Sequence, residues 1–156
     1  METSLKIYTD GGCSGNPGPG GWAYVIIVNT FQGEKMIAQN KGAEKSTTNN
    51  RMELSAVIEA LRALKSLDGL PRHVTVYTDS QYVQKGISEW IIAWKRNSWR
   101  TSDKKPVKNQ DLWMELDSIN GELSVNWEWV RGHAGNEYNE LCDQMTQEAI
   151  ASCVMA

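Results

Sequence analysis

Two short segments of the chain share one pattern, an alternating run of β-forming residues that closes on Thr-Asp. They are Lys6–Asp10, with the sequence KIYTD, and Thr75–Asp79, with the sequence TVYTD. A helix-forming segment lies between them, and two strands joined through a helix normally pair in parallel. If the two segments are neighbouring strands, their terminal carboxylates converge. No other feature of the chain constrains its fold as strongly.

A third acidic residue, Glu53 in TTNNRMEL, lies at the start of the predicted helix between these strands. Converging carboxylates repel one another, which raises their pKa values or recruits a divalent cation. Mg²⁺ favours oxygen ligands and is commonly held by one or two carboxylates together with substrate phosphates. Asp10, Glu53 and Asp79 therefore predict a magnesium site for phosphate chemistry. For Glu53 an alternative stays open, because an acidic residue in the first turn of a helix also stabilises the helix dipole.

Hydrophobic periodicity predicts the element order β-β-β-α-β-α-α-β-α. The predicted strands cover residues 5–8, 22–28, 35–40, 73–78 and 125–130, and helices follow near residues 49, 80, 111 and 138. Short links between the first three strands favour an antiparallel meander, to which parallel strands are added. The expected fold is therefore α/β: a mixed five-stranded sheet, with three antiparallel strands and then two parallel ones, flanked by helices.

The length of 156 residues suits one domain with a hydrophobic core, and we expect residues 1–156 to form a single domain. No stretch approaches the roughly 20 apolar residues of a membrane span, and the first residues have no signal-peptide pattern. Cys13, Cys142 and Cys153 are too few and too scattered for a disulfide framework or a zinc site. We therefore expect a cytoplasmic monomer with no membrane partner.

The net charge of −3 conceals one basic segment, residues 85–108. Its seven basic residues stand against Glu89 and Asp103, which gives this segment a charge of +5 and leaves −8 for the remainder. A basic segment on an acidic body is typical of a protein that binds a polyanion. Trp90 and Trp94 border the basic residues and Trp99 lies among them, which makes a groove for a nucleic-acid backbone plausible. The alternative is a solvated loop, with Trp90 and Trp94 on the buried face of a helix.

Local sequence pattern predicts where the remaining tryptophans and two polar residues near the C-terminus lie. Trp22, Trp127 and Trp129 lie in strands and are expected in the core. His133, in VRGHAGN, lies on a glycine-flanked loop just past a strand, where a histidine either transfers protons or is simply exposed. Asp143 lies on the last helix, off its apolar stripe, and periodicity alone predicts solvated surface.

Five sequence blocks, in this order and spacing, resemble bacterial type 1 ribonuclease H. They are TDGGCSGNPGPGGW, TTNNRMEL, YTDSQYV, WRTSDKKPVKNQDLW and VRGHAGNEYNELCD, and the resemblance runs from about residue 6 to residue 149. It implies a ribonuclease H-like catalytic domain with a basic protrusion, which cuts the RNA strand of RNA–DNA hybrids. It also implies Mg²⁺ as the cofactor, with Mn²⁺ as a substitute and two ions when substrate is bound. The products would carry 5′-phosphate and 3′-hydroxyl ends.

The same resemblance implies roles for individual residues. Asp10, Glu53, Asp79 and Asp143 match four metal-site carboxylates, and His133 matches a histidine thought to assist proton transfer or product departure. The positions that match contacts to the hybrid minor groove, where 2′-hydroxyls are read, are Gly12, Cys13, Asn16, Asn49 and Gln81. Thr48 matches a phosphate pocket for the DNA strand. The aromatic channel and basic protrusion would comprise Trp90, Trp94, Lys95, Arg96, Trp99, Lys104 and Lys105.

The chain departs from the family pattern at two places. Gly12 stands where relatives often have serine, and the protrusion, KRNS at residues 95–98, is less basic than usual. Both differences bear on hybrid affinity and its salt dependence rather than on catalysis. Two other functions stay open: an integrase-like DNA strand transferase and a non-catalytic hybrid-binding module. The GHAG loop and the protrusion disfavour the first, and four intact carboxylates, which would repel phosphates, disfavour the second.

Overall fold

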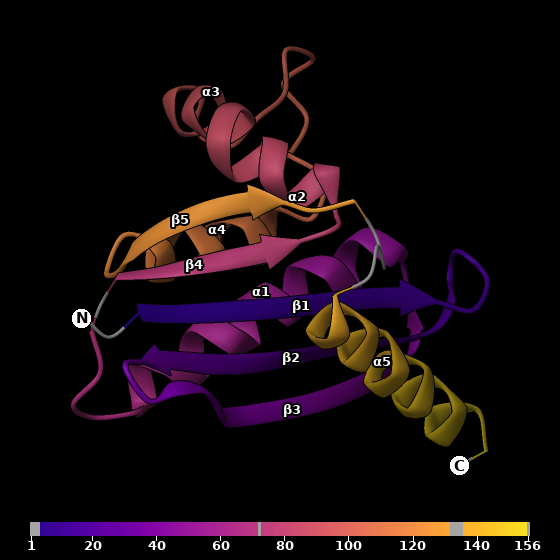
Figure 1. Ribbon diagram of the computed structural model, residues 1–156. Coiled ribbons are helices and arrows are strands. Elements are labelled where there is room, and N and C mark those ends of the chain that lie inside the picture. Colours follow the sequence, from indigo (N-terminus) through magenta and orange to yellow (C-terminus); the bar gives the residue numbers. More distant parts are fainter. Residues whose placement is uncertain (1–3, 72, 132–135, 156) are drawn as a thin grey trace.

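The computed structural model describes residues 4–71, 73–131 and 136–155. Within them, one sheet has the strand order β3-β2-β1-β4-β5, with helices on both of its faces (Figure 1). The strands are β1 (Ser4–Cys13), β2 (Gly18–Thr30), β3 (Gly33–Thr47), β4 (His73–Thr78) and β5 (Ser124–Trp129). The helices are α1 (Asn49–Ser66), α2 (Gln81–Lys85), the π-helical turn η1 (Gly86–Trp90), α3 (Ile91–Arg96), α4 (Gln110–Asn120) and α5 (Glu137–Met155).

The pairing of the strands confirms the predicted mixed sheet. β1, β2 and β3 form the antiparallel meander, and β4 and β5 are added in parallel. The two segments that end on Thr-Asp are indeed neighbours, with Lys6 opposite Thr75 and Tyr8 opposite Tyr77. The first three strands are longer than predicted, with β3 extending to Thr47. β1 continues to Cys13, so that Asp10 lies inside it, opposite Ala23. The backbone ladder with β2 continues through the glycines, since ladder hydrogen bonds need no side chain.

The core is divided between the two faces of the sheet. Figure 1 shows α1 and α4 behind the sheet and α5 in front of it. On the first face, apolar residues of α1 such as Leu54 and Leu61 are fully buried and pack with Trp113 of α4. Each such leucine stabilises the fold by about 1.5–3 kcal/mol through burial. On the other face, Cys142 and Met145 of α5 pack against β1 and β2. The central strand β1 is therefore covered on both sides.

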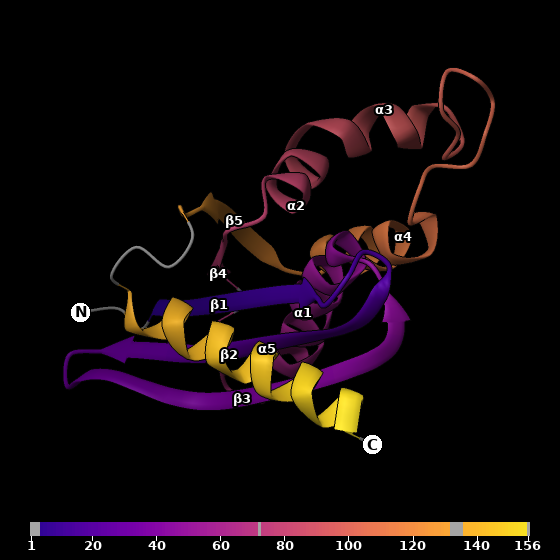
Figure 2. The same ribbon diagram turned by 90° about the vertical axis from the view of Figure 1, so that its right-hand side faces the viewer.

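The helix predicted to begin near residue 80 is present, but it contains a π-helical turn. α2 passes through η1 into α3, and Figure 2 shows these helices extending away from the sheet. A Cβ atom on Gly86 would collide with the indole of Trp113, so this glycine lets the π-helical turn pass close to α4. π-Helical turns of this kind occur often near functional sites.

Two expectations about tryptophan burial are wrong. Trp129, predicted in the core, is 40% exposed at the end of the edge strand β5. Trp22 and Trp127 are partly buried and pack against the core. Trp90 is 37% exposed, so the buried-face interpretation fails for it, whereas Trp94 is half-buried.

Two expectations from the sequence concern the cysteines and membrane-spanning helices. Cys13, Cys142 and Cys153 are all free cysteines. Among the helices of the described residues, none combines the length and the apolar character needed to cross a lipid bilayer.

Candidate active site

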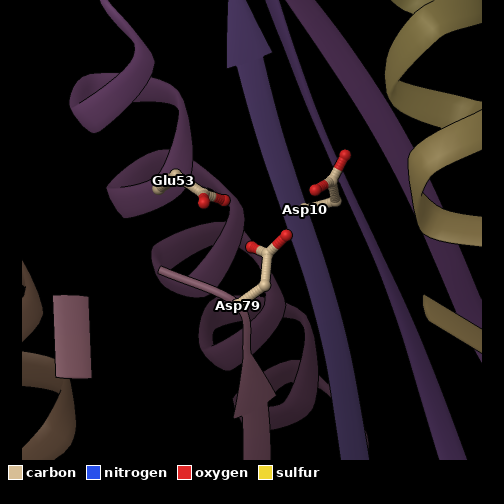
Figure 3. A group of neighbouring side chains, drawn as sticks. All are labelled: Asp10, Glu53 and Asp79. Carbon is tan, nitrogen blue, oxygen red and sulfur yellow. The ribbon is translucent and has the colours of Figure 1, made fainter. Parts of the chain in front are cut away.

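Three carboxylates from three elements meet on the central part of the sheet. Asp10 belongs to β1, Asp79 directly follows β4, and Glu53 belongs to α1. One oxygen from each lies within 4.8 Å of the others, and the three could hold a metal ion. Figure 3 shows Glu53 reaching from α1 toward β1, with the Asp79 carboxylate directed between Glu53 and Asp10. We call these three residues the acidic group. The parallel pairing of β1 with β4 brings the two aspartates together, as the sequence predicted.

Glu53 does not act as a helix-dipole residue. α1 begins at Asn49, which places Glu53 in the second turn, and the first turn contains no acidic residue. The dipole effect falls off within the first turn. Glu53 is also buried, with only 6% of its surface exposed. The local sequence could not separate the two interpretations, because the exact start of a helix is poorly fixed by pattern alone.

Burial and charge repulsion both act on Glu53. Burial raises the pKa of Glu53 well above its ordinary value of 4.5, and the charges of Asp79 and Asp10 and a side-chain hydrogen bond with Asp79 raise it further. A backbone hydrogen bond from Gly11 opposes these effects and is the smallest of the causes. The negative field also reaches α5, where burial and the charge of Asp10 raise the pKa of the Cys142 thiol. The carboxylates of the acidic group therefore repel one another in the folded protein.

The donor atoms of the acidic group fit a divalent cation. Among the described residues, Glu53 Oε1 and Asp79 Oδ1 are buried side-chain oxygens without a hydrogen-bond partner. A buried carboxylate oxygen without a partner is costly, and a bound cation would compensate it. All three side chains offer oxygen, which suits Mg²⁺ or Mn²⁺ better than zinc.

A glycine beside the acidic group sets the distance between β1 and α1. A Cβ atom on Gly11 would collide with the backbone carbonyl carbon of Met52 and the backbone nitrogen of Glu53. Only glycine allows this close backbone approach. Sequence reasoning missed this role, although the Gly-Gly pair directly after Asp10 was a signal for it.

Asp143, the fourth predicted carboxylate, lies on α5 and is half-buried rather than fully solvated. It is not part of the group of three oxygens described above. The residues around it fasten α5 to β1: Cys142 Sγ donates a hydrogen bond to Tyr8 O (3.3 Å), and Thr146 Oγ1 donates one to Asp10 O (3.4 Å). Asp143 therefore belongs to a helix that is attached to β1 at Asp10 itself. His133 lies outside the described residues.

The loop after β1 and the start of α1 form one connected surface. The Asn16 side chain accepts a hydrogen bond from the Asn49 backbone N–H (3.1 Å). Cys13 Sγ donates to the carbonyls of Gly18 and Thr47, each at 3.3 Å. The structure thus brings together Cys13, Asn16 and Asn49, which are separate in sequence.

Three other predicted contact residues lie around this surface. Thr48 is the N-cap of α1, where its hydroxyl accepts a hydrogen bond from the Arg51 N–H (3.3 Å). A Cβ atom on Gly12 would be at ordinary contact distance from Asn49 Oδ1 (3.9 Å), so this glycine is not required by packing. Gln81 is the exposed first residue of α2, two positions after Asp79.

A row of aromatic rings leads from α2 into the basic segment. The ring centroids are 5.8 Å apart for Tyr82 and Trp90, 6.0 Å for Trp90 and Trp94, and 6.4 Å for Trp94 and Trp99. Sequence reasoning missed Tyr82, although it lies on the same helical segment and was within reach of the same periodicity. The row is half-exposed, as a stacking surface requires.

The predicted basic residues lie at the far end of this row. Lys95 and Arg96 are exposed in the last turn of α3, and Lys104 and Lys105 are exposed in the loop that follows. Lys95 also forms an ion pair with Asp117 of α4 at 3.3 Å. The loop returns to the core at Val107, which is buried and donates its N–H to Trp99 O (3.1 Å).

The sheet order and the helices on both of its faces define a protein of the ribonuclease H fold. The solved structure of LC9-RNase H1, a type 1 RNase H with the type 2 active-site motif, is similar to this chain at a TM-score of 0.84 and 32% identity. The match covers 95% of this chain and 72% of that one. LC11-RNase H1, solved in complex with RNA/DNA hybrid, has the same fold at a TM-score of 0.70 and 24% identity, covering 97% and 99% of the two chains.

The chain belongs to the RNase H family, whose family model matches residues 2–151. It is 54% identical to a ribonuclease H of Treponema denticola, with 94% of this chain and 96% of that protein covered. It is 55% identical to a ribonuclease H of Cupriavidus pinatubonensis, with 94% of each chain covered. Relatives of this name are nucleases, so the chain is an enzyme of that class.

Proposed function

We propose that the chain is an endoribonuclease that hydrolyses the RNA strand of RNA–DNA hybrids and leaves 5′-phosphate and 3′-hydroxyl ends. The observation that carries the proposal is the acidic group, three converging carboxylates with two unpartnered buried oxygens. Family membership supports ribonuclease H activity. The structure of LC11-RNase H1, which was solved in complex with an RNA/DNA hybrid, supports the choice of substrate.

The proposed cofactor is Mg²⁺, with Mn²⁺ as a substitute and two ions when substrate is bound. Asp10, Glu53 and Asp79 would hold it, together with Asp143 from α5. Bound divalent cations supply Lewis acidity and an activated water for phosphodiester displacement. The three carboxylates bind through oxygen, and the raised pKa of Glu53 makes metal and proton compete for that side chain. His133 is proposed to assist proton transfer or product departure.

The proposed substrate contacts are the remaining residues that match the family pattern. Gly12, Cys13, Asn16, Asn49 and Gln81 would face the minor groove of the hybrid, where the 2′-hydroxyls identify RNA. Thr48 would contact a phosphate of the DNA strand. The row Trp90, Trp94 and Trp99 would stack against the DNA strand, and Lys95, Arg96, Lys104 and Lys105 would attract its phosphates.

We further propose that residues 1–156 act as one catalytic domain, as a monomer in the cytoplasm. The small number and wide spacing of the cysteines in the sequence support a reducing compartment. Light scattering across a concentration series tests the monomer, and a constant mass near 17.5 kDa is the expected result.

A gel assay tests the proposed activity. Labelled RNA–DNA hybrid, double-stranded RNA and double-stranded DNA are incubated with the protein in Mg²⁺ or in EDTA. We expect cleavage of the RNA strand, only in the hybrid and only with Mg²⁺. End-labelling of the products checks the predicted 5′-phosphate and 3′-hydroxyl. Joining of DNA ends would instead indicate a strand transferase, and binding without cleavage would indicate a non-catalytic module.

A further inference from the structure

Trp129 contacts the backbone of one residue of the acidic group. Its indole Nε1–H donates a hydrogen bond to the carbonyl oxygen of Asp79 at 3.1 Å. The next residue, Val130, donates its backbone N–H to Thr78 O at 2.9 Å. The end of β5 therefore holds two consecutive peptide carbonyls at the point where β4 ends. This explains why a large apolar side chain stays 40% exposed at the edge of the sheet.

Within the described part of the chain, the backbone beside Asp79 is also held locally, because the Ser80 N–H donates a hydrogen bond to Thr78 Oγ1 at 3.1 Å. The pairing of β4 with β1 extends only as far as Tyr77, and β4 itself ends at Thr78. On the far side, Ser80 is the N-cap of α2 and accepts a hydrogen bond from the Val83 N–H at 3.1 Å. Asp79 is therefore a junction between a strand and a helix, and its carbonyl is held by the indole of Trp129.

We infer that Trp129 is a positioning residue for metal binding, acting through the backbone of Asp79. This inference rests on the proposed function, because it assumes that Asp79 is a metal ligand. The indole donates to the peptide carbonyl of Asp79, so it would orient this ligand through the backbone. Outer partners of metal ligands typically change metal affinity by about 10–100-fold. Because this contact reaches the carboxylate only through the backbone and Cβ of Asp79, we expect an effect at the low end of that range, about tenfold.

The same strand provides a matched control. Trp127 lies two residues before Trp129, and its indole Nε1–H donates a hydrogen bond to Asn120 Oδ1 on α4 at 3.2 Å. Trp127→Phe and Trp129→Phe each remove one indole hydrogen bond from β5. Only Trp129→Phe removes a hydrogen bond to a residue of the acidic group. Any general weakening of β5 should therefore appear in both variants.

The experiment measures Mn²⁺ binding to substrate-free protein by calorimetry, unfolding by urea in EDTA, and the metal dependence of hybrid cleavage. For Trp129→Phe we expect about tenfold weaker Mn²⁺ binding. The metal concentration for half-maximal cleavage should rise by a similar factor, and kcat at saturating metal should fall much less. Trp127→Phe should lose stability without either change. If Trp129→Phe does not fold, the benzothiophene analogue of tryptophan at position 129 keeps the ring shape without the N–H.

Two results would overturn the inference. One is equal Mn²⁺ binding by the wild type and the Trp129 variant. The other is an equal loss of metal affinity in both tryptophan variants, which would make the effect a general one of β5. Failure of the wild type itself to bind Mn²⁺, or binding unaffected by Asp79→Asn, would instead reject the acidic group as a metal site. The inference and the proposed function therefore fail in different ways.

Discussion

The acidic group and the basic segment are built in opposite ways. The acidic group sits on β1, the end of β4 and α1, and Asp10 and Glu53 are only 7% and 6% exposed. The basic segment lies on α2, η1, α3 and the loop after them, away from the sheet, with its lysines and arginines exposed (Figure 2). One region concentrates negative charge inside the fold, and the other spreads positive charge over an extension of it.

Because of this difference, changes in the two regions should be detected by different measurements. Buried like charges oppose folding, so changes in the acidic group should alter stability and chemistry together. Exposed charges contribute little to stability but attract a polyanion over a distance set by salt. Changes in the basic segment should therefore alter affinity and its salt dependence and leave folding nearly unchanged.

The largest expected effect is that of Asp10→Asn. We expect it to abolish cleavage and yet to raise the unfolding free energy of the metal-free protein by about 1 kcal/mol or more, because it removes repulsion within the acidic group. Hybrid cleavage in Mg²⁺ and urea unfolding in EDTA measure the two effects. Asp103→Asn, an exposed acidic residue of the basic segment, is the control and should change neither. Lower stability of the Asp10 variant would contradict the idea that the carboxylates strain the fold.

The next largest effect concerns the glycine that lets β1 approach α1. Gly11→Ala should lower the unfolding free energy by about 3 kcal/mol, because its Cβ would collide with the backbone of Met52 and Glu53. Gly12→Ala, one residue later, meets only ordinary contacts and should change stability by less than about 1 kcal/mol. Urea unfolding of both variants tests this pair. Equal stabilities would mean that the acidic group does not depend on this close approach.

The stability of the metal-free protein should also depend on pH. The folded pKa of Glu53 is raised, so its protonated form is favoured by folding. Its contribution to the unfolding free energy is fully present below the unfolded pKa and is lost as pH rises through the raised folded value. Stability should therefore fall with rising pH in that window, and saturating Mg²⁺ should restore it.

Urea unfolding over a pH series in EDTA measures this dependence. Glu53→Gln should flatten it, whereas Glu89→Gln, an exposed acidic residue of the basic segment, should leave it intact. A wild-type curve that rises over the same window would show that Glu53 is not held in its protonated form by burial.

The smallest expected effect is in the basic segment. Replacement of Lys95 and Arg96 together by alanine should weaken hybrid binding across all sequences and reduce the salt slope by about one unit per lost phosphate contact. The matched control replaces Lys41 and Lys35 of β3 together by alanine. Lys41 forms an ion pair with Glu148, as Lys95 does with Asp117, and Lys35 is exposed, as Arg96 is. Binding is measured in EDTA at several salt concentrations. A salt slope equal to that of the control would leave the basic segment as an ordinary solvated loop.

Much of the fold and part of the site were predictable from local pattern. The alternation in Lys6–Asp10 and Thr75–Asp79 predicted two strands, and the helix between them predicted their parallel pairing, which the structure confirms. Leu54 and Leu61, seven residues apart at helical spacing, both lie on the buried face of α1. These inferences succeeded because strand and helix periods are local properties of the chain. The resemblance to ribonuclease H, carried by five blocks, is likewise confirmed by the family match.

Other features depended on how the elements pack. The second-turn position of Glu53, the exposure of Trp129 and the π-helical turn η1 between α2 and α3 could not be read from period alone. The position of Glu53 depends on where α1 begins, directly after its N-cap Thr48. The other two features depend on what lies opposite, the carbonyl of Asp79 and the indole of Trp113.

The sequence by itself determined the strands, the helices, the pairing of β1 with β4, and the choice of carboxylates as the reactive residues. Only the tertiary structure decided that Asp10, Glu53 and Asp79 lie within 4.8 Å of one another, and that Trp129 holds the backbone of the last of them. The physical reason is that secondary structure follows local patterns of side chains, whereas a site depends on close approaches between distant backbones. Packing across the sheet sets these approaches, and a local sequence pattern does not contain that information.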